Sequence, residues 1–404
     1  MKVLFLGQQY DRTKEVEYLK LSRQGLSASG NEYQWNICDG LLEHLGTDME
    51  IISVLPVGTY PKRFRQLKLQ NRFWTYRGIK VDELGSLNLP FIKPLQREIS
   101  CYKKIKNWSN KFSGEQRLII VYSLYLPYLK AVCRALRADP SLRAIIIVTD
   151  LPGKYGVLPD GKVKAALFSA IGKVALSYSK YFHGYILLTG EMRIPLNTGN
   201  KPYTIIDGIT KKNGCEINSS SACSMVPYIL YTGALNKVYG VCDLLDAFEL
   251  MDNSEAELWI CGAGGAADEI QARAEKNPKI KFLGFQPKEK ILQLQANAAV
   301  LVNPRTSQGE YTKYSFPSKT IEYMASGTPT VMHRLPGVSK EYEEYIVFAR
   351  DDSCQSLAEA MQTVLNWPPA QREAFGKKGQ VFVKENKNPY VQAKKLLDMA
   401  EQLF

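Results

Sequence analysis

The sequence lacks an apolar run close to the roughly 18 residues that a membrane-spanning helix requires. The longest candidate, residues 118–129, lies between Arg117 and Lys130 and is interrupted by Pro127. A secretory signal is not expected either, because the opening MKVLFLG is typical of a short strand and polar residues follow it at once. We therefore expect a cytosolic protein without a membrane-spanning segment.

Residues that commonly bind metals or form disulfides are few or poorly placed. The chain has three histidines and eight cysteines, and no two cysteines form a C-x-x-C pair. Several cysteines lie in apolar patterns, as reduced and buried thiols do. The sequence also contains no D-x-D motif, the pair of hard oxygen ligands that suits Mg²⁺ or Mn²⁺. We therefore expect no bound metal and no cofactor.

Acidic residues do not balance the basic ones in the first half of the chain. Residues 1–210 contain 30 Lys and Arg against 17 Asp and Glu, whereas residues 211–404 contain 22 against 23. The net charge of +12 therefore comes from the first half. Such asymmetry indicates an anionic partner for that half: a membrane face, nucleic acid or a phosphorylated acceptor.

The length of 404 residues suits two domains rather than one hydrophobic core. Short apolar strands alternate with amphipathic helices, which indicates α/β units on parallel sheets. The expected strands are residues 2–6, 49–54, 118–122, 144–148, 184–188, 204–206, 229–232, 258–261, 281–283, 300–302 and 330–332. The expected helices of the first half are residues 33–45, 127–136 and 163–181. Residues 211–225 are polar and Ser-rich, as linkers are, so the predicted domains are 1–210 and 226–389.

The most informative segment is residues 303–331, NPRTSQGEYTKYSFPSKTIEYMASGTPTV. After a polar loop, Pro317 is predicted to open a helix that carries Lys319 and Glu322 and ends at Gly327. The start of a helix offers unpaired N–H groups and the positive end of a dipole, which suits phosphate. Glu322 lies one turn further, where a carboxylate can accept hydrogen bonds from sugar hydroxyls. The alternative is an exposed i, i+3 ion pair without a ligand.

This segment resembles the donor-site signature of family 4 glycosyltransferases of the GT-B fold, in the variant FPSK-x₂-EYMASG-x-P. The family's two glutamates, eight positions apart, would fall on Tyr314 and Glu322, so the first is absent. The resemblance implies that Glu322 holds the donor's ribose hydroxyls and leaves Glu310 and Tyr314 as candidates for the sugar-contacting role. It also implies two Rossmann-like doubly wound domains facing a central cleft, with the last helix, about 390–404, packed on the first domain.

Three further segments, residues 229–248, 258–270 and 279–304, follow the family's order. Residues 229–248 resemble the strand, Gly loop and helix that open the donor domain, where Gly233 would let the backbone approach the donor phosphates. The family's Arg and Lys at this loop are replaced by Ala234 and Tyr239. The charge that stabilises a leaving diphosphate must then come from the helix start and from cations elsewhere, with candidates Lys319, Arg305, Lys313 and Lys237.

The Gly-rich turn in residues 258–270 includes Gly262 but does not satisfy G-x-G-x-x-G, so it is weak evidence for phosphate binding by itself. The resemblance places the nucleotide base against Phe285 and Gln286. A core position for Phe285 is an equal alternative.

Two sites are expected in the first domain. A loop at residues 25–31, which includes Gly30, would face the donor phosphates, with a mobile surface loop as the alternative. Asp150 follows a strand, where ligands gather in α/β sheets, and is preferred over Asp207 as the catalytic carboxylate. A turn role for Asp150 is the alternative. The expected catalytic residues are Asp150, Glu310 and Lys319, and the expected donor-binding residues are Gly30, Gly233, Lys237, Gly262, Phe285, Gln286, Arg305, Tyr314, Ser315, Phe316, Pro317, Ser318, Lys319 and Glu322.

Residues 61–80 carry seven Lys and Arg interleaved with apolar residues such as Phe64, Phe73 and Trp74, and residues 101–111 add more cations and Trp108. This combination suits docking on an anionic bilayer or on single-stranded nucleic acid. Because the chain has no nucleic-acid-binding motif, we favour the membrane and expect no nucleic-acid partner. A solvated basic face is the third alternative.

The resemblance and the charge together predict a retaining, metal-independent glycosyltransferase with a nucleoside-diphosphate sugar, of UDP type, as co-substrate. Its expected acceptor is a lipid-linked glycan, as in bacterial capsule, exopolysaccharide or O-antigen synthesis, at the inner face of the cell membrane. The alternative is a glycosyltransferase-like scaffold that has lost catalysis, which the departures at Tyr314, Ala234 and Tyr239 suggest. A nucleotide-sugar epimerase is disfavoured because its acid and base residues have no counterpart here.

Overall fold

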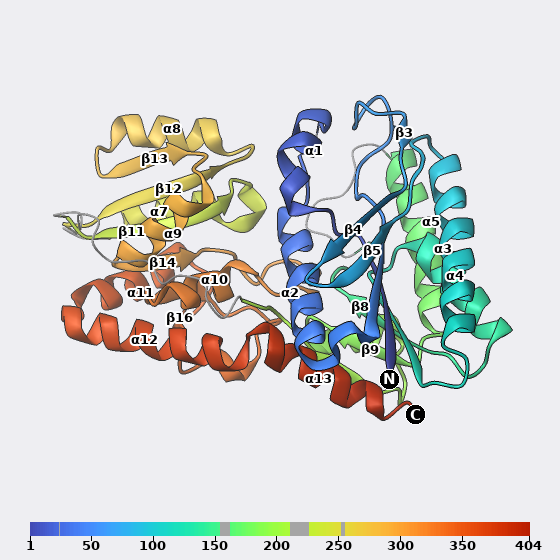
Figure 1. Ribbon diagram of the computed structural model, residues 1–404. Helices are drawn as coiled ribbons and strands as arrows, with labels where there is room; N and C mark the ends of the chain where they lie inside the picture. The colour runs from blue at the N-terminus through green and yellow to red at the C-terminus, as the bar shows by residue number, and fades with distance from the viewer. Residues whose placement is uncertain (24, 154–161, 211–225, 252–254) are drawn as a thin grey trace. The chain divides into compact units, whose positions relative to one another are not determined.

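The computed structural model describes residues 1–23, 25–153, 162–210, 226–251 and 255–404, and the chain forms two compact units (Figure 1). Unit 1 comprises Met1–Ile209 and Pro389–Phe404, and unit 2 comprises Thr210–Asn388. The expected linker at 211–225, with Cys215 and Cys223, lies outside the described residues. Among the described helices, none is both long enough and apolar enough to cross a bilayer.

Unit 1 is built on an eight-stranded sheet in the order β10-β9-β8-β7-β1-β2-β5-β4. All neighbours in it are parallel except β4 and β5, which form an antiparallel hairpin. Its central strands are apolar on both faces, as strands covered by helices on both sides must be. The strands are β1 (Lys2–Gly7), β2 (Met49–Ser53), β4 (Arg72–Tyr76), β5 (Ile79–Glu83), β7 (Arg117–Tyr122), β8 (Arg143–Val148), β9 (Gly184–Leu187) and β10 (Tyr203–Ile205), with β3 (Lys68–Leu69) and β6 (Ser86–Leu87) forming a separate small sheet.

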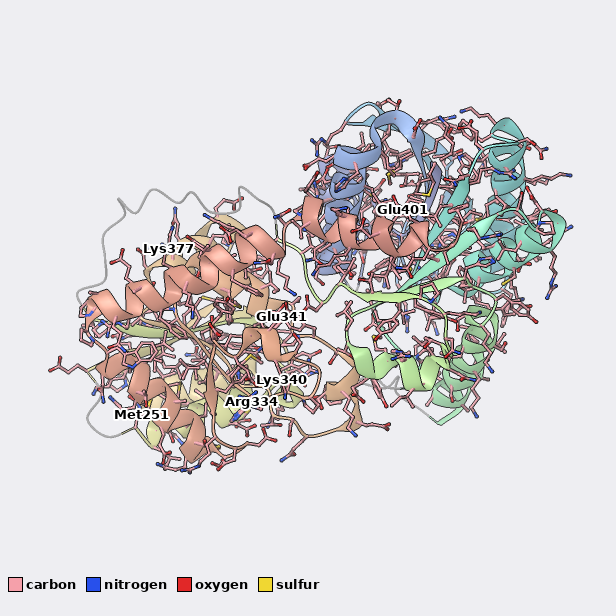
Figure 2. The ribbon with its side chains drawn as sticks, turned by 90° about the horizontal axis from the view of Figure 1, so that it is seen from below. Met251, Arg334, Lys340, Glu341, Lys377 and Glu401 are labelled. Carbon is pink, nitrogen blue, oxygen red and sulfur yellow. The ribbon has the colours of Figure 1, made fainter. Side chains whose placement is uncertain are left out.

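Helices cover both faces of this sheet (Figure 1). On one face, α2 (Ala28–Leu45) packs against α13 (Pro389–Glu401), which carries Glu401 in Figure 2. On the other face, α4 (Leu126–Ala138) packs between α3 (Ile92–Lys111) and α5 (Lys162–Ser179). Two short helices, α1 (Glu15–Leu21) and α6 (Arg193–Leu196), complete the unit.

Unit 2 contains a six-stranded, entirely parallel sheet in the order β13-β12-β11-β14-β15-β16. Its strands are β11 (Tyr228–Ala234), β12 (Glu257–Ala263), β13 (Ile280–Gly284), β14 (Val300–Asn303), β15 (Thr330–His333) and β16 (Val347–Ala349). Its helices are α7 (Val241–Glu249), α8 (Ala267–Lys276), α9 (Lys288–Asn297), α10 (Lys319–Ser326), α11 (Cys354–Asn366) and α12 (Pro369–Asn386). The predicted α/β class with two doubly wound units is confirmed.

Each strand predicted from the sequence corresponds to a strand of the structure, with bounds that differ by one or two residues. The helix predicted at 33–45 is wrong at its start, because α2 already begins at Ala28. The long helices α3, α11 and α12 and the β4–β5 hairpin were not predicted. The hairpin and α3 occupy the basic stretches that the sequence had suggested as a docking surface.

Candidate functional site

The site predicted at residues 303–331 forms where β14 ends and α10 begins. The helix starts at Lys319, two residues after the predicted Pro317, with Ser318 as its N-cap. Pro317 instead belongs to the preceding turn, in which its carbonyl accepts a 2.8 Å hydrogen bond from the N–H of Thr320. Gly327 ends the helix with φ of +82°, a conformation that glycine adopts at little cost. The side chain of Ser318 makes no capping bond, so it does not satisfy the N–H groups of the first turn.

Glu322 is half-buried and held by two donors. Its Oε1 accepts hydrogen bonds from Lys319 Nζ at 3.0 Å and from Gln295 Nε2 at 2.7 Å. Burial alone would raise the pKa of Glu322, but the Lys319 charge and these hydrogen bonds bring it below its usual value. The carboxylate therefore stays ionised and can accept further hydrogen bonds.

A network of buried polar side chains holds Gln295, one of the two donors to Glu322, in place. Gln295, on α9, is fully buried, and its Nε2 also lies 3.0 Å from Thr232 Oγ1 on β11. The hydroxyl of Tyr323 bonds the backbone N–H and carbonyl of the same threonine at 2.9 and 3.0 Å. Thr232, Gln295 and Tyr323 thus fix β11, α9 and α10 relative to one another. No role was predicted for any of the three from the sequence.

Arg305 is the most unusual cation of this region. It follows β14 and is only 8% exposed, and its Nη2 donates a 2.7 Å hydrogen bond to Ser315 Oγ. Its Nε is buried without a partner, and none of the ion pairs found among the described residues includes Arg305. The guanidinium lies over the rings of Tyr311 and Tyr239, with its Cζ 4.6 and 5.9 Å from their centroids. A buried guanidinium with an unused donor is suited to bind an anion.

The β11–α7 loop reaches Arg305 through a close backbone contact. Gly240 has φ of +76°, and a Cβ there would lie 2.2 Å from the carbonyl oxygen of Pro304. Only glycine fits, and it places Tyr239 beside the guanidinium. Tyr239 stands where the resembled family has a lysine, so at this position the structure supplies an aromatic support for the Arg305 cation.

The loop between β14 and α10 is anchored on both sides. The N–H of Ser307 lies 3.1 Å from both carboxylate oxygens of Asp352, and its hydroxyl donates to the same group at 2.5 Å. Ser315 Oγ donates to the carbonyl of Tyr311 at 3.0 Å while it accepts from Arg305. Phe316 is buried and packs beside Tyr342, with ring centroids 5.3 Å apart. The loop thus has one defined course, which sets the position of Arg305.

The two candidates for the missing acid lie together in the short 3-10 helix Glu310–Tyr314. The hydroxyl of Tyr314 donates a 3.2 Å hydrogen bond to Glu310 Oε1. Glu310 is exposed and Tyr314 is half-buried. Both residues lie shortly before Ser315 in the sequence. The sugar-contacting role of either residue stays a prediction.

The other predicted cations of unit 2 have different surroundings. Lys237 is exposed and forms a 2.6 Å ion pair with Glu269, which raises the pKa of the lysine. Lys319 shares its charge with Glu322, and Lys313 is exposed on the 3-10 helix. Arg305 is therefore the predicted phosphate cation that combines burial with an unused donor.

Two predicted glycines have a packing reason for being glycine. Gly233 and Gly262 are register partners on β11 and β12, and a Cβ on Gly262 would lie 1.9 Å from the carbonyl oxygen of Gly233. Their role at phosphates stays a prediction.

Phe285 is 80% exposed, so the alternative that it belongs to the core is wrong. It follows Gly284 at the end of β13, and the adjacent Gln286 bonds the carbonyl of Leu283 at 2.5 Å.

In unit 1 the predicted loop at 25–31 is partly wrong. Gly30 lies in the first turn of α2, and its carbonyl accepts a 3.0 Å hydrogen bond from Gln34 Nε2. The loop that actually follows β1 is tied to this helix, since Tyr10 N–H donates to Asn31 Oδ1 at 2.9 Å.

Asp150, the predicted catalytic carboxylate, is exposed just after β8 and accepts a hydrogen bond from the neighbouring Thr149 hydroxyl at 3.1 Å.

The basic and aromatic stretch at 61–80 divides its large apolar side chains between the core and the surface. Phe64 is fully buried. Trp74, on strand β4 of the hairpin, is half-buried and packs against the core. Trp108, in the second stretch, is also buried. Phe73 and Leu67 of the first stretch are 59% and 42% exposed among outward-facing cations, so a docking surface there stays a prediction.

One group of residues in the described ranges has metal-ligand spacing: Asp243, Asp246 and Cys354. Asp246 already pairs with Arg273 at 2.7 Å, which reduces its availability for a cation. This group lies on α7 and α11, and none of its three residues is among the predicted donor-site residues. The geometry therefore does not connect it with the chemistry discussed below.

Comparisons with known proteins identify the fold and the second unit. Residues 226–366 match the family model described as Glycosyl transferases group 1. No curated protein matches the sequence significantly. Sucrose-phosphate synthase from Thermosynechococcus elongatus superposes with a TM-score of 0.67 at 16% identity, covering 100% of this chain and 99% of that one.

Two further solved structures agree. Anabaena HepE in complex with UDP gives a TM-score of 0.63 at 14% identity and covers 100% of both chains. Trehalose 6-phosphate synthase from Burkholderia multivorans gives 0.65 at 10% identity, covering 100% of this chain and 97% of that one. The fold is GT-B, and the match of the second unit makes the chain a glycosyltransferase.

Proposed function

We propose that the chain transfers a sugar from a UDP-type nucleotide sugar to an acceptor hydroxyl, with retention of anomeric configuration and without a metal ion. The observation that carries this proposal is Arg305, a buried guanidinium with an unused Nε donor beside the start of α10. Burying a cation without a counter-ion costs roughly several kcal/mol of folding free energy. A diphosphate bound beside the guanidinium would offset that cost.

The chemistry follows from where charge develops. As the bond between the anomeric carbon and the diphosphate oxygen breaks, negative charge grows on the leaving group. Arg305, the N–H groups at the start of α10 and Lys319 are the groups proposed to stabilise it. They hold fixed positions before the reaction, because Ser315 and Tyr311 orient the guanidinium. The acceptor oxygen forms the new bond, and its proton passes to the proposed base, Asp150.

Glu322 is proposed to bind the ribose hydroxyls of the donor. Its depressed pKa keeps it an acceptor at neutral pH, and Lys319 and Gln295 leave its second oxygen, Oε2, for the ligand. The UDP preference is supported by the similarity in fold to a UDP complex of Anabaena HepE. Phe285, exposed at the end of β13, is the proposed contact for the base.

The proposed acceptor is a lipid-linked glycan at the cytoplasmic face of the membrane. The net charge of the chain, +12, comes from residues 1–210, and such a surface is attracted to anionic lipids and to a polyprenyl diphosphate alike. This part of the proposal depends on charge rather than on the donor site. The two parts therefore need separate tests.

The donor proposal is tested by titrating UDP into wild-type protein and Arg305→Gln in a calorimeter. Loss of a charged, buried contact should weaken UDP binding by about 30-fold or more, equivalent to roughly 2 kcal/mol. The matched control is Lys377→Gln, which removes an exposed cation on α12 of the same unit (Figure 2) and should leave UDP affinity unchanged.

Two outcomes would contradict the proposal. Equal UDP affinity of Arg305→Gln and wild type, with both variants folded, would remove Arg305 from the donor site. UDP binding without transfer of sugar to any lipid-linked acceptor would instead favour the scaffold alternative.

A further inference from the structure

The outer face of α5 is apolar, although a surface helix ordinarily presents polar residues to solvent. Leu167, Ile171 and Val174 are 55%, 46% and 42% exposed. Their spacing of four and three residues places them on one stripe of the helix, and the exposed Ala170 lies within it. Burial of this stripe would be favourable, and within the described residues nothing covers it.

The adjacent face of α5, roughly a quarter turn around the helix, is fixed against the protein. Ala175 and Ser179 are buried there. A Cβ on Gly172 would lie 2.2 Å from Cβ of Pro152, so the chain that follows β8 packs directly on the helix at this glycine. This contact sets the rotation of α5 about its axis. The apolar stripe therefore faces outward as a consequence of the fold.

Lysines flank the stripe, and acids are absent. Lys164 and Lys173 are exposed and, at about 100° per residue, lie at its two opposite edges. No Asp or Glu occurs from residue 161 to residue 190. The layer of α3, α4 and α5 carries twelve Lys and Arg and one acidic residue, Glu98, which pairs with Lys130 at 3.8 Å.

A second exposed apolar stripe lies in the same helical layer. Phe91, Leu95 and Ile99, at the start of α3 and at intervals of four residues, are all exposed. Further along this stripe the residues become basic, with Lys103 and Lys106 exposed. An apolar stripe bordered by cations thus occurs on two helices of the layer.

We propose that the outer face of α5 docks on an anionic lipid bilayer. The apolar stripe would enter the interface between headgroups and acyl chains, and the flanking lysines would extend to the lipid phosphates. A second copy of this chain is the competing occupant. Two copies of α5 would bring Lys164 and Lys173 together without acids to pair them, whereas an anionic membrane supplies the complementary charge.

This surface is separate from the stretch at 61–80, which buries Phe64 but exposes Phe73. It rests on the membrane-facing part of the proposed function and does not depend on glycosyl transfer. Docking through α5 would bring unit 1 to a lipid-linked acceptor without any membrane-spanning segment.

The test uses the full chain and sedimentation with two kinds of vesicle, phosphatidylglycerol mixed with phosphatidylethanolamine, and phosphatidylcholine alone. Wild type should bind the first kind preferentially. The double variant Leu167→Glu with Ile171→Glu should lose at least tenfold in partitioning. The matched control, Val16→Glu with Leu19→Glu, alters two exposed apolar residues of α1 and should behave as wild type.

Failure of wild type to bind anionic vesicles, or equal binding by the α5 variant and its control, would overturn the proposal. A dimer of wild type in light scattering that the α5 variant converts to a monomer would favour the second copy instead. UDP titration of the same proteins separates the two proposals. Vesicle binding without UDP binding would contradict the donor site and leave the docking surface intact.

Discussion

Glu322 shows how a single carboxylate can be kept ionised in a half-buried position. Lys319 lies one turn before it on the same helix, and Gln295 approaches from α9. Together they outweigh the loss of hydration and lower its pKa. The same Gln295 amide also bonds Thr232, so the carboxylate and the buried network behind it depend on one another. A ligand that bonds Glu322 meets a group that is already oriented.

Glu322→Gln is predicted to make stability less dependent on pH. A carboxylate with a depressed folded pKa stabilises the fold above its unfolded value, near 4.5, and this contribution is lost as pH falls through the folded pKa. Wild type should therefore exceed the variant in unfolding free energy by roughly 1–3 kcal/mol at pH 6, and the gap should close towards pH 3. Urea unfolding at a series of pH values measures it.

The control for this prediction is Glu289→Gln, an exposed acid on α9. Its difference from wild type should stay small at every pH. If the gap between wild type and Glu322→Gln does not change between pH 6 and pH 3, the carboxylate is not stabilised in its charged form.

At this scale the sequence could indicate only local partners. Lys319 and Glu322 are three residues apart, so their ion pair follows from helical spacing alone. The supporting Thr232 is 63 residues from Gln295 and 91 from Tyr323, and only the parallel sheet brings these segments together. The sequence also could not show that Arg305 is buried with an unpaired Nε, because its burial depends on Tyr239 and Tyr311.

At the scale of elements, the strands were predictable and several long helices, α3 among them, were not. The strands are short apolar runs between polar segments, and the central ones are buried on both faces. The inner face of α3 includes Lys93 and Arg97, both buried. Their charged ends bond the carbonyls of Val57 and Leu55, at 2.7 and 2.9 Å. Burial lowers the pKa of Lys93 to about 7. Charged residues on a core-facing side hide the helical periodicity of the sequence.

The contact between α2 and α13 gives a prediction for these two elements. A Cβ on Gly40 would lie 2.0 Å from the carbonyl oxygen of Pro389, so Gly40→Val should force the helices apart. The expected loss of stability is about 1–3 kcal/mol, measured by thermal or urea unfolding. Gly265→Ala is the control, because no atom lies within 4 Å of a Cβ at that position. An unchanged midpoint for Gly40→Val would mean that α13 can move without cost.

At the scale of the whole molecule, the two units share an architecture and differ in charge. The division of basic residues was visible in the sequence, because counting charge needs no structure. The surface that carries the charge was not, because the stretch richest in Lys, Arg and aromatic residues buries some aromatic side chains, such as Phe64, and exposes others, such as Phe73. The exposed apolar stripe of α5 became evident only once the packing of Gly172 on Pro152 fixed the orientation of that helix.

Membrane association of the full chain is predicted to weaken as salt rises. The Debye length falls from about 10 Å at 0.1 M salt to about 3 Å at 1 M, so the attraction between surface lysines and anionic lipids is screened. Partitioning onto phosphatidylglycerol vesicles should fall at least about fivefold between about 0.1 and 0.5 M NaCl. The apolar stripe is not screened, so some binding should remain at high salt.

The charge of α5 should account for part of that salt dependence. The double variant Lys164→Gln with Lys173→Gln should reduce the decline of vesicle binding with rising salt. The control is Lys276→Gln with Lys290→Gln, which removes two exposed lysines of the nearly neutral second half and should leave that decline unchanged. Salt-independent binding by wild type would contradict electrostatic docking. An equal slope for both double variants would assign the attraction to the net charge of unit 1 as a whole. The slope thus distinguishes a surface that is specifically placed on α5 from one that is merely basic.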